Sequence, residues 1–275
     1  MHSIKDIRIN LADFEKKLKL RNSEVKIVSI QDLDKKNRDL IKKKESLEQE
    51  KKIISKTKDS SLFQKSKELS KEIDKIQQEQ ILVQKNLDEI LNKLPNIALD
   101  DVPVGKDEKS NKVISEKGKI KKFTFIPKSH FELGKSLGMI DFELASKTTG
   151  TRFVFLRGPI ALLERAISNF MVDIHTQNYN YVEISPPLMA SVPTMYGTGQ
   201  LPKFEEDQFE VKLEKDSERK FLIPTAEVIL TNMVREKILS FKDLPIRLVA
   251  STPCFRKEAG SYGKDTKGMM RQHQF

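Results

Sequence analysis

Cysteine and tryptophan are nearly missing from this sequence of 275 residues, which contains one cysteine, Cys254, and no tryptophan. A single cysteine excludes an internal disulfide framework and a zinc site built on cysteines, and it fits a reducing compartment. The first residues carry a charge every few positions, so they lack the apolar core of a secretory signal. No apolar run approaches the ~18 residues that a membrane span needs. We therefore expect a cytoplasmic protein that does not enter a membrane.

Histidine is also scarce, with four residues in the chain. Their spacing is not that of metal ligands, so no metal site is predicted. We expect His273 to pack within the structure rather than to act in catalysis, and Cys254 to lie in the core. The histidines are His2, His130, His175 and His273.

Charged residues, in contrast, are abundant: 50 lysines and arginines stand beside 40 aspartates and glutamates, for a net charge of +10. This excess is compatible with a polyanionic partner such as nucleic acid. A lysine-rich composition without such a partner explains it equally well.

A seven-residue hydrophobic repeat runs through residues 30–94, where neither glycine nor proline occurs. The polar break at 55–61 predicts two long antiparallel helices, which form a projecting coiled-coil hairpin. Polar residues at seam positions are expected to fix its register. Residues 35–58 carry an excess of six positive charges, typical of a solvated helix face or of an RNA contact. The polar seam residues are Asn37, Lys44, Lys51 and Gln80.

After this arm, residues 95–118 are polar and contain proline and glycine, as a linker does. We therefore predict an α+β protein with an N-terminal domain at 1–118 and a second domain at 119–275. In the second domain the pattern predicts helices and strands in alternation. The predicted helices are 159–177 and 225–239, and the predicted strands are 181–185, 220–223 and 246–258.

The last predicted strand is followed by a glycine-containing loop and a second extended segment, 271–275. Because side chains alternate between the faces of a strand, Arg256 and Glu258 share one face, and Arg271 and Phe275 share a face of the second segment. Arginine grips phosphate, a carboxylate accepts hydrogen bonds from an amino group, and a phenyl ring stacks on a base. The arrangement predicts a nucleoside triphosphate site, although an ordinary surface hairpin has the same spacing. The loop glycines are Gly260, Gly263 and Gly268.

The segment "CFRKEAGSYGKDTKGMMRQHQF" resembles motif 2 of class II aminoacyl-tRNA synthetases, in the version found in bacterial-type seryl-tRNA synthetases. "TGTRFVFLRGPIALLERAISNFMVDIH" followed by "YVEISPPLM" resembles motif 1 of that family, and "FLIPTAEV" resembles its serine-binding segment. The arm stands where the family has its tRNA-binding hairpin. The resemblance therefore implies a partial class II catalytic domain with an antiparallel sheet behind that hairpin.

The resemblance also implies roles for individual residues. Arg256 is the implied catalytic residue, which contacts the α-phosphate and the serine carboxylate. Pro187 matches the motif 1 proline at a dimer interface. Local sequence alone favours Thr225 as a helix N-cap with Glu227 in the first turn, and only the family resemblance indicates serine binding instead. The implied serine-binding residues are Thr225, Ala226, Glu227 and Arg256, and the implied ATP-binding residues are Arg256, Lys257, Glu258, Arg271 and Phe275.

The implied function is ATP-dependent activation of L-serine and its transfer to tRNA(Ser), with tRNA(Sec) as a second acceptor, in a homodimer. Mg²⁺ is implied with ATP, through ligands outside this chain. The glycine-rich motif 3 of the family is absent from the sequence, so we expect an incomplete and inactive version of the enzyme. A truncated module that binds tRNA through the arm without forming adenylate is the alternative. A ligase that loads a carrier protein and a purely structural coiled coil explain less of the sequence.

Overall fold

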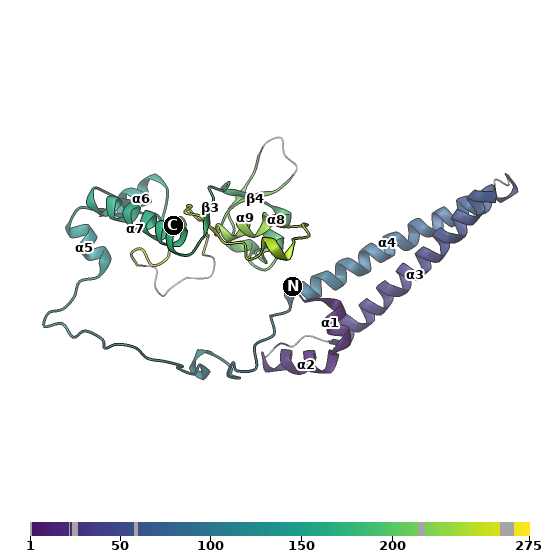
Figure 1. Cartoon of the computed structure of the whole chain (residues 1–275), viewed down its shortest axis with the longest axis horizontal. Helices are drawn as coiled ribbons and strands as arrows, with labels where there is room; N and C mark the ends of the chain where they lie inside the picture. Colours follow the sequence, from purple (N-terminus) through teal and green to yellow (C-terminus); the bar gives the residue numbers. More distant parts are fainter. Residues whose placement is uncertain (1, 22, 24–26, 58–59, 214–217, 259–266) are drawn as a thin grey trace. The chain divides into compact units, whose positions relative to one another are not determined.

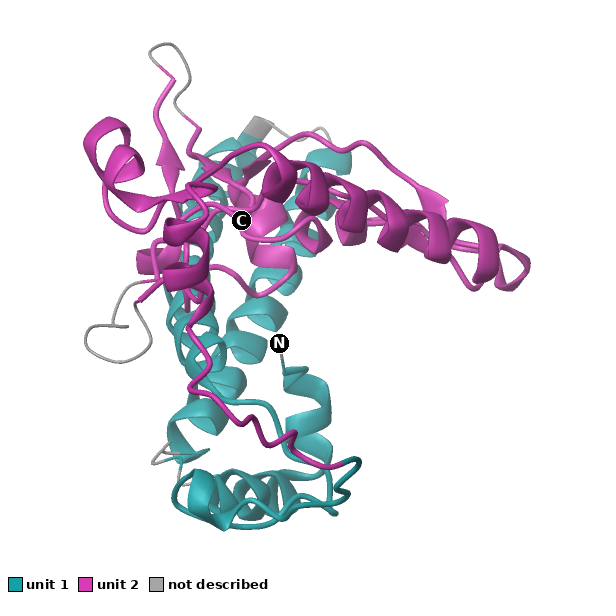
Figure 2. Ribbon diagram, turned by 90° about the vertical axis from the view of Figure 1, so that its left-hand side faces the viewer, with its two compact units in different colours: residues 1–118 teal, residues 119–275 magenta. Residues whose placement is uncertain are grey.

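The computed structural model describes the chain except for residues 1, 22, 24–26, 58–59, 214–217 and 259–266. The chain runs from purple to yellow in Figure 1. It divides into two compact units, residues 1–118 and 119–275, which are teal and magenta in Figure 2. Among the described residues, no helix is both long enough and apolar enough to cross a membrane.

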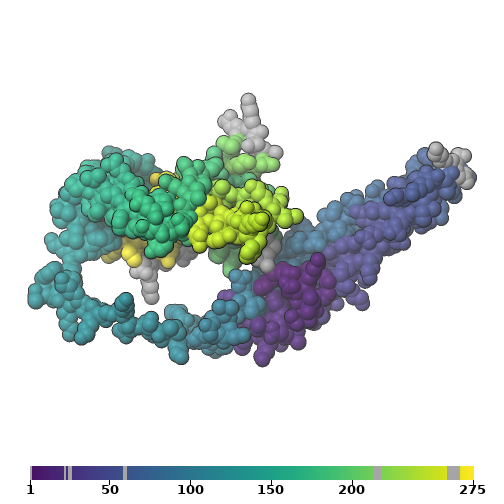
Figure 3. Space-filling model, in the orientation of Figure 1, coloured from purple at the N-terminus to yellow at the C-terminus, as the bar shows by residue number. Residues whose placement is uncertain are grey.

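Two helices of 31 residues each form the hairpin of the first unit, α3 (Ile27–Thr57) and α4 (Phe63–Lys93), with the short 3₁₀ helix η1 (Ser60–Leu62) before α4. The two helices adjoin along the hairpin in Figure 3. The predicted coiled-coil arm is thereby confirmed. At 1.5 Å per residue each helix is about 46 Å long. The buried α4 side chains follow the heptad pattern up to Leu87, after which Leu91 is buried in place of Ile90. They are Leu69, Ile73, Ile76, Val83, Leu87 and Leu91.

The base of the arm packs against two helices that the sequence analysis did not predict, α1 (Ile4–Ile9) and α2 (Leu11–Leu20). They are short, so their periodic signal is weak. Ser3 caps the first of them by accepting a hydrogen bond of 3.4 Å from the Asp6 backbone N–H. Residues 94–118 then contain one short 3₁₀ helix, η2 (Glu108–Ser110). The shared core of the base comprises Ile7, Phe14, Leu18, Ile27, Ile30, Leu87, Leu91 and Leu94.

The second unit begins with α5 (His130–Ser136), β1 (Ile140–Asp141), α6 (Phe142–Thr148) and β2 (Phe155–Leu156), in which β1 and β2 pair antiparallel. The helix α7 (Pro159–Asn178) follows, with proline in its first turn as predicted.

A three-stranded antiparallel sheet holds the core of this unit, in the order β4 (Met189–Ser191), β6 (Lys220–Leu222), β5 (Glu210–Val211). Two short helices, α8 (Val192–Gly197) and α9 (Glu227–Asn232), supply further core side chains. The core residues are Ala190, Met195, Leu201, Phe221, Ile223 and Val228.

Two details of the predicted secondary structure are wrong. The strand predicted at 246–258 is reduced to β7 (Leu248–Val249), because Pro253 has no N–H for a ladder. β7 pairs parallel with β3 (Val182–Glu183), beside the antiparallel sheet of β4, β6 and β5. The helix predicted at 225–239 ends at Asn232, and Glu236 has the left-handed φ of 59°. Two 3₁₀ helices, η3 (Glu205–Asp207) and η4 (Phe241–Asp243), complete the unit.

Candidate active site

Two extended segments pair antiparallel at the predicted hairpin. Cys254 and Phe275 exchange two backbone hydrogen bonds, of 2.7 and 3.0 Å, and the Arg256 N–H donates to the His273 carbonyl at 2.9 Å. Residues directly opposite each other in an antiparallel pair project from the same face. Arg256 and Phe275 therefore lie on one face, as the alternation predicts. Cys254, expected in the core, is only half-buried.

The Arg256 guanidinium joins this hairpin to a second predicted segment. Its central carbon lies 5.1 Å from the centroid of the Phe275 ring, a distance typical of a cation–π contact. Its Nε donates a hydrogen bond of 3.2 Å to the carbonyl oxygen of Pro224, directly before Thr225. Phe275 is 55% exposed, so this face is open to a ligand.

The predicted serine-binding residues lie at the start of α9. The helix is bounded at Ala226, which already has helical φ and ψ and makes no side-chain cap hydrogen bond, so the contact expected of an N-cap comes from Thr225. The Thr225 hydroxyl does accept a long hydrogen bond, 3.4 Å, from the Glu227 N–H. The Glu227 side chain is exposed. Ala226 and Glu227 also line a mostly apolar cleft of about 810 Å³ beside Tyr181 and Leu248.

Glu258 and Arg271, both predicted to bind ATP, form an ion pair of 2.6 Å. The Glu258 side chain is 17% exposed, and its backbone has a left-handed φ of 51°. Lys257 contacts another residue, with its Nζ 5.8 Å from the centroid of the Phe209 ring. The structure therefore brings Glu258 and Arg271 together and places Lys257 beside Phe209.

Two residues at this site were missed by the sequence analysis. His130, at the start of α5, accepts a hydrogen bond of 2.8 Å on Nε2 from the Met269 N–H. Gly268 has φ 70°, and a Cβ there would come within 2.3 Å of the same Nε2, so only glycine fits. Arg152 donates to the carbonyl oxygen of Glu258 at 3.1 Å. Both His130 and Arg152 lie more than 100 residues before the residues they contact in the hairpin. The sequence around each of them therefore gives no indication that it belongs to this site.

His273 packs between Phe153 and Phe209, at ring-centroid distances of 5.4 and 5.8 Å. It thus occupies the structural position expected for it. The loop glycines Gly260 and Gly263 lie outside the described residues. Within the described part of the chain, no three histidine, cysteine, aspartate or glutamate side chains gather to hold a metal ion.

Comparison with known proteins decides the family. The chain is 60% identical over all 275 residues to the serine–tRNA ligase of Pelagibacter ubique, of which it spans 66%. It is 33% identical to the seryl-tRNA synthetase of Pyrococcus horikoshii, solved in complex with ATP, and it superimposes on 68% of that chain with a TM-score of 0.82. The chain belongs to the seryl-tRNA synthetase family.

Other similarities agree with membership of the seryl-tRNA synthetase family. Residues 1–98 match the family model described as the seryl-tRNA synthetase N-terminal domain, and residues 209–275 match the class II core domain of G, H, P, S and T synthetases. The serine–tRNA ligase of Parvibaculum lavamentivorans is 44% identical over 289 residues, and the chain spans 66% of it. The predicted α+β fold, with the helical hairpin before a partial class II domain, is confirmed.

Proposed function

We propose that the full-length protein activates L-serine with ATP to form seryl-adenylate and then transfers serine to tRNA(Ser). The observation that carries this proposal is the position of Arg256. Its guanidinium contacts both the exposed ring of Phe275 and the carbonyl of Pro224, which leads into Thr225–Glu227. The cation proposed to bind phosphate thus contacts both the ring proposed to stack on adenine and the residue directly before the segment proposed to bind serine.

In the proposed first step, a carboxylate oxygen of serine attacks the α-phosphorus of ATP. A new oxygen–phosphorus bond forms while the bond from the α-phosphorus to the bridging oxygen breaks, and pyrophosphate leaves. Arg256 stabilises the charge that develops at phosphorus, and the Glu227 carboxylate binds the serine ammonium group. Phe275 stacks on adenine. Catalysis then comes from positioning and charge, without a protein nucleophile. Mg²⁺ bound with ATP would neutralise phosphate charge, and the residues proposed above act on serine, on the α-phosphorus and on adenine.

The test is serine-dependent exchange of pyrophosphate into ATP by the full-length protein. We expect exchange with L-serine and much slower exchange with L-alanine, which lacks the hydroxyl, and with L-threonine, which adds a methyl group. An exchange rate that is the same with all three amino acids, or no exchange at all, contradicts the proposal.

We further propose that the arm formed by α3 and α4 binds tRNA. Several lysines of α3, among them Lys42, Lys52 and Lys56, are exposed along its length. Contacts between such lysines and RNA phosphates weaken steeply with salt. Replacing residues 31–93 by a short glycine linker should spare pyrophosphate exchange and abolish tRNA charging. Normal charging by this variant would remove the arm from the mechanism.

The alternative function, a module that binds tRNA without forming adenylate, is favoured by one observation: the arm has a hydrophobic core of its own at its base. Serine-dependent pyrophosphate exchange distinguishes the two functions, because only the enzyme carries it out. Salt-dependent tRNA binding by a full-length protein without serine-dependent exchange would support the binding module.

A further inference from the structure

Two left-handed residues contact each other at the hairpin. Arg152 has φ 62° and Glu258 has φ 51°, and the Arg152 Nη1 donates a hydrogen bond of 3.1 Å to the Glu258 carbonyl oxygen. Residues other than glycine adopt this conformation at a cost in free energy, and they keep it where surrounding contacts hold them. Such residues gather at functional sites. The other left-handed residues besides glycine in the described chain are Asn180 and Glu236.

Arg152 also replaces part of the hairpin ladder. In a regular antiparallel pair, the His273 N–H would donate to the Arg256 carbonyl, because Arg256 already donates to His273. The His273 N–H instead donates to the Arg152 carbonyl at 2.9 Å, and the Arg256 carbonyl lies 2.9 Å from His273 Nδ1. The backbone of Arg152 thus holds one strand of the hairpin while its side chain holds the end of the other, at Glu258.

Glu258 is therefore fixed from two directions. Arg152 binds its carbonyl oxygen, and Arg271 binds its carboxylate at 2.6 Å. The left-handed turn at Glu258 decides where that carboxylate points, since φ sets the direction of the side chain relative to the strand. Loss of the Arg152 guanidinium would let Glu258 relax toward ordinary backbone conformations and move its carboxylate.

We propose that Arg152 is a positioning residue for nucleotide recognition: its guanidinium holds Glu258 in the left-handed conformation that aims the carboxylate at the exocyclic amino group of adenine. This inference rests on the proposed function for the identity of the nucleotide. It predicts that Arg152 affects the affinity for ATP and the preference for adenine over other bases, both through Glu258. The affinity for serine should change little.

The experiment compares Arg152→Met, which keeps the length of the side chain but has no donor, with Arg152→Lys, which keeps one. Pyrophosphate exchange by the full-length protein gives KM for ATP, KM for serine and the preference for ATP over ITP, which has an oxygen in place of the amino group. Arg152→Met should raise KM for ATP by about tenfold and reduce the ATP preference by a similar factor. Arg152→Lys should stay near wild type, and so should the matched control Arg157→Met, since Arg157 pairs with Asp141 away from the hairpin.

A double-mutant cycle separates positioning from general stabilisation. In a Glu258→Ala background the carboxylate is gone, so Arg152→Met should have no further effect on KM for ATP. An equal effect in both backgrounds, or equal KM values for Arg152→Met and Arg152→Lys, overturns the inference. Isothermal titration calorimetry with ATP measures the Kd of the same variants and so makes the same comparison without catalysis. If wild type binds ATP but shows no exchange, the proposed function fails while the role of Arg152 is still decided by this binding measurement.

Discussion

The Nε atom of Arg256 lies 3.2 Å from the carbonyl oxygen of Pro224, 32 residues earlier in the chain. This hydrogen bond joins the hairpin to the segment that begins α9. Beside it, the Phe255 N–H donates to the Ile223 carbonyl at 2.9 Å. Backbone and side chain together hold the arginine between the two places proposed for ATP and serine.

Arg256→Ala should reduce kcat/KM for serine-dependent exchange by about 100-fold or more, because a preorganised charge at the reacting phosphorus is lost. Arg256→Lys should recover little, since an ammonium group cannot make the bidentate contact of a guanidinium. Arg256 is exposed, so thermal melting should hardly change. Arg157→Ala is the matched control and should retain its exchange rate. Near-normal exchange by Arg256→Ala would refute the proposed role.

Glu227→Gln should raise KM for serine and leave KM for ATP nearly unchanged, because the amide loses the charge that binds the serine ammonium group. The measurement is the same exchange assay with each substrate varied in turn. Glu236→Gln is a suitable control: Glu236 is exposed in the same unit, nine residues further along the chain. A change in both KM values of similar size would show that Glu227 does not act on serine specifically.

The periodic parts of the chain could be predicted from the sequence. The heptad pattern gives the α3–α4 hairpin, and the alternation of Arg256 with its neighbours places it on the face of Phe275. These features depend on local spacing alone. The segment Thr225–Glu227 is assigned to the same site only through the family resemblance.

The remaining features depend on contacts between distant segments. Arg152 lies 106 residues before Glu258, and His130 lies 139 residues before Met269. The left-handed φ of Glu258 is stabilised by such contacts, so no residue preference near position 258 indicates it. The parallel pairing of β3 with β7 likewise depends on how α7 and the later chain fold together. The alternation of hydrophobic residues along a strand does not indicate whether the strand pairs parallel or antiparallel.

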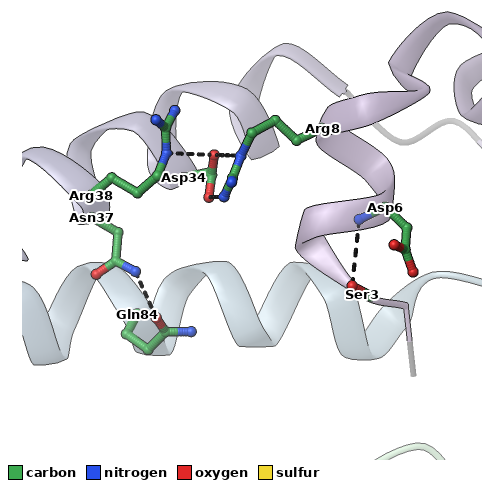
Figure 4. A network of polar contacts seen from close by, with 7 residues as sticks. All are labelled: Ser3, Asp6, Arg8, Asp34, Asn37, Arg38 and Gln84. Carbon is green, nitrogen blue, oxygen red and sulfur yellow. Dashed lines mark hydrogen bonds and ion pairs between the residues drawn. The ribbon is translucent and has the colours of Figure 1, made fainter.

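Asp34 should make the base of the arm sensitive to acid. This aspartate is buried, and it accepts hydrogen bonds from Arg8 and Arg38, drawn in Figure 4. Burial alone would raise its pKa, but the hydrogen bond and charge of Arg8, together with Arg38, outweigh burial and lower the pKa of Asp34 below its usual value. A lowered pKa stabilises the fold above the unfolded-state pKa of about 3.9, and this contribution is lost as pH falls through the folded-state value.

The expected loss for Asp34→Asn is about 2 kcal/mol in the free energy of unfolding at pH 7, the range for hydrogen bonds to charged groups. Helical circular dichroism during urea unfolding measures it. At pH 3 the difference between wild type and variant should shrink. Asp39→Asn, at an exposed position of the same helix, is the control. A difference that persists unchanged at low pH would contradict the ion-pair explanation.

Asn37 should fix the register of the arm. It is buried between the two helices, where its Nδ2 donates to Gln84 at 2.7 Å and its Oδ1 accepts from Gln80 at 2.9 Å. Polar pairs of this kind cost stability but penalise shifted pairings. The double change Asn37→Leu with Gln84→Leu should therefore raise the melting temperature and admit other registers. Broadened spin-label distances between α3 and α4 would report them. Lys44→Leu, at a half-buried seam position, should leave the distances narrow, and narrow distances in both variants would refute the prediction.

The apolar side of α7 should form the interface of a homodimer, which we propose from the resemblance to motif 1 and from exposure. Besides Leu162, four apolar side chains of α7 are between 48% and 62% exposed, and exposed patches of this kind mark interaction surfaces. Phe170→Lys combined with Leu163→Lys should convert the full-length protein from dimer to monomer by mass photometry, with cooperative melting retained. Ile238→Lys is the control, because Ile238 is fully exposed outside α7, and it should remain dimeric. A dimer that survives both charges on α7 would place the interface elsewhere. The four side chains are Leu163, Ile167, Phe170 and Met171.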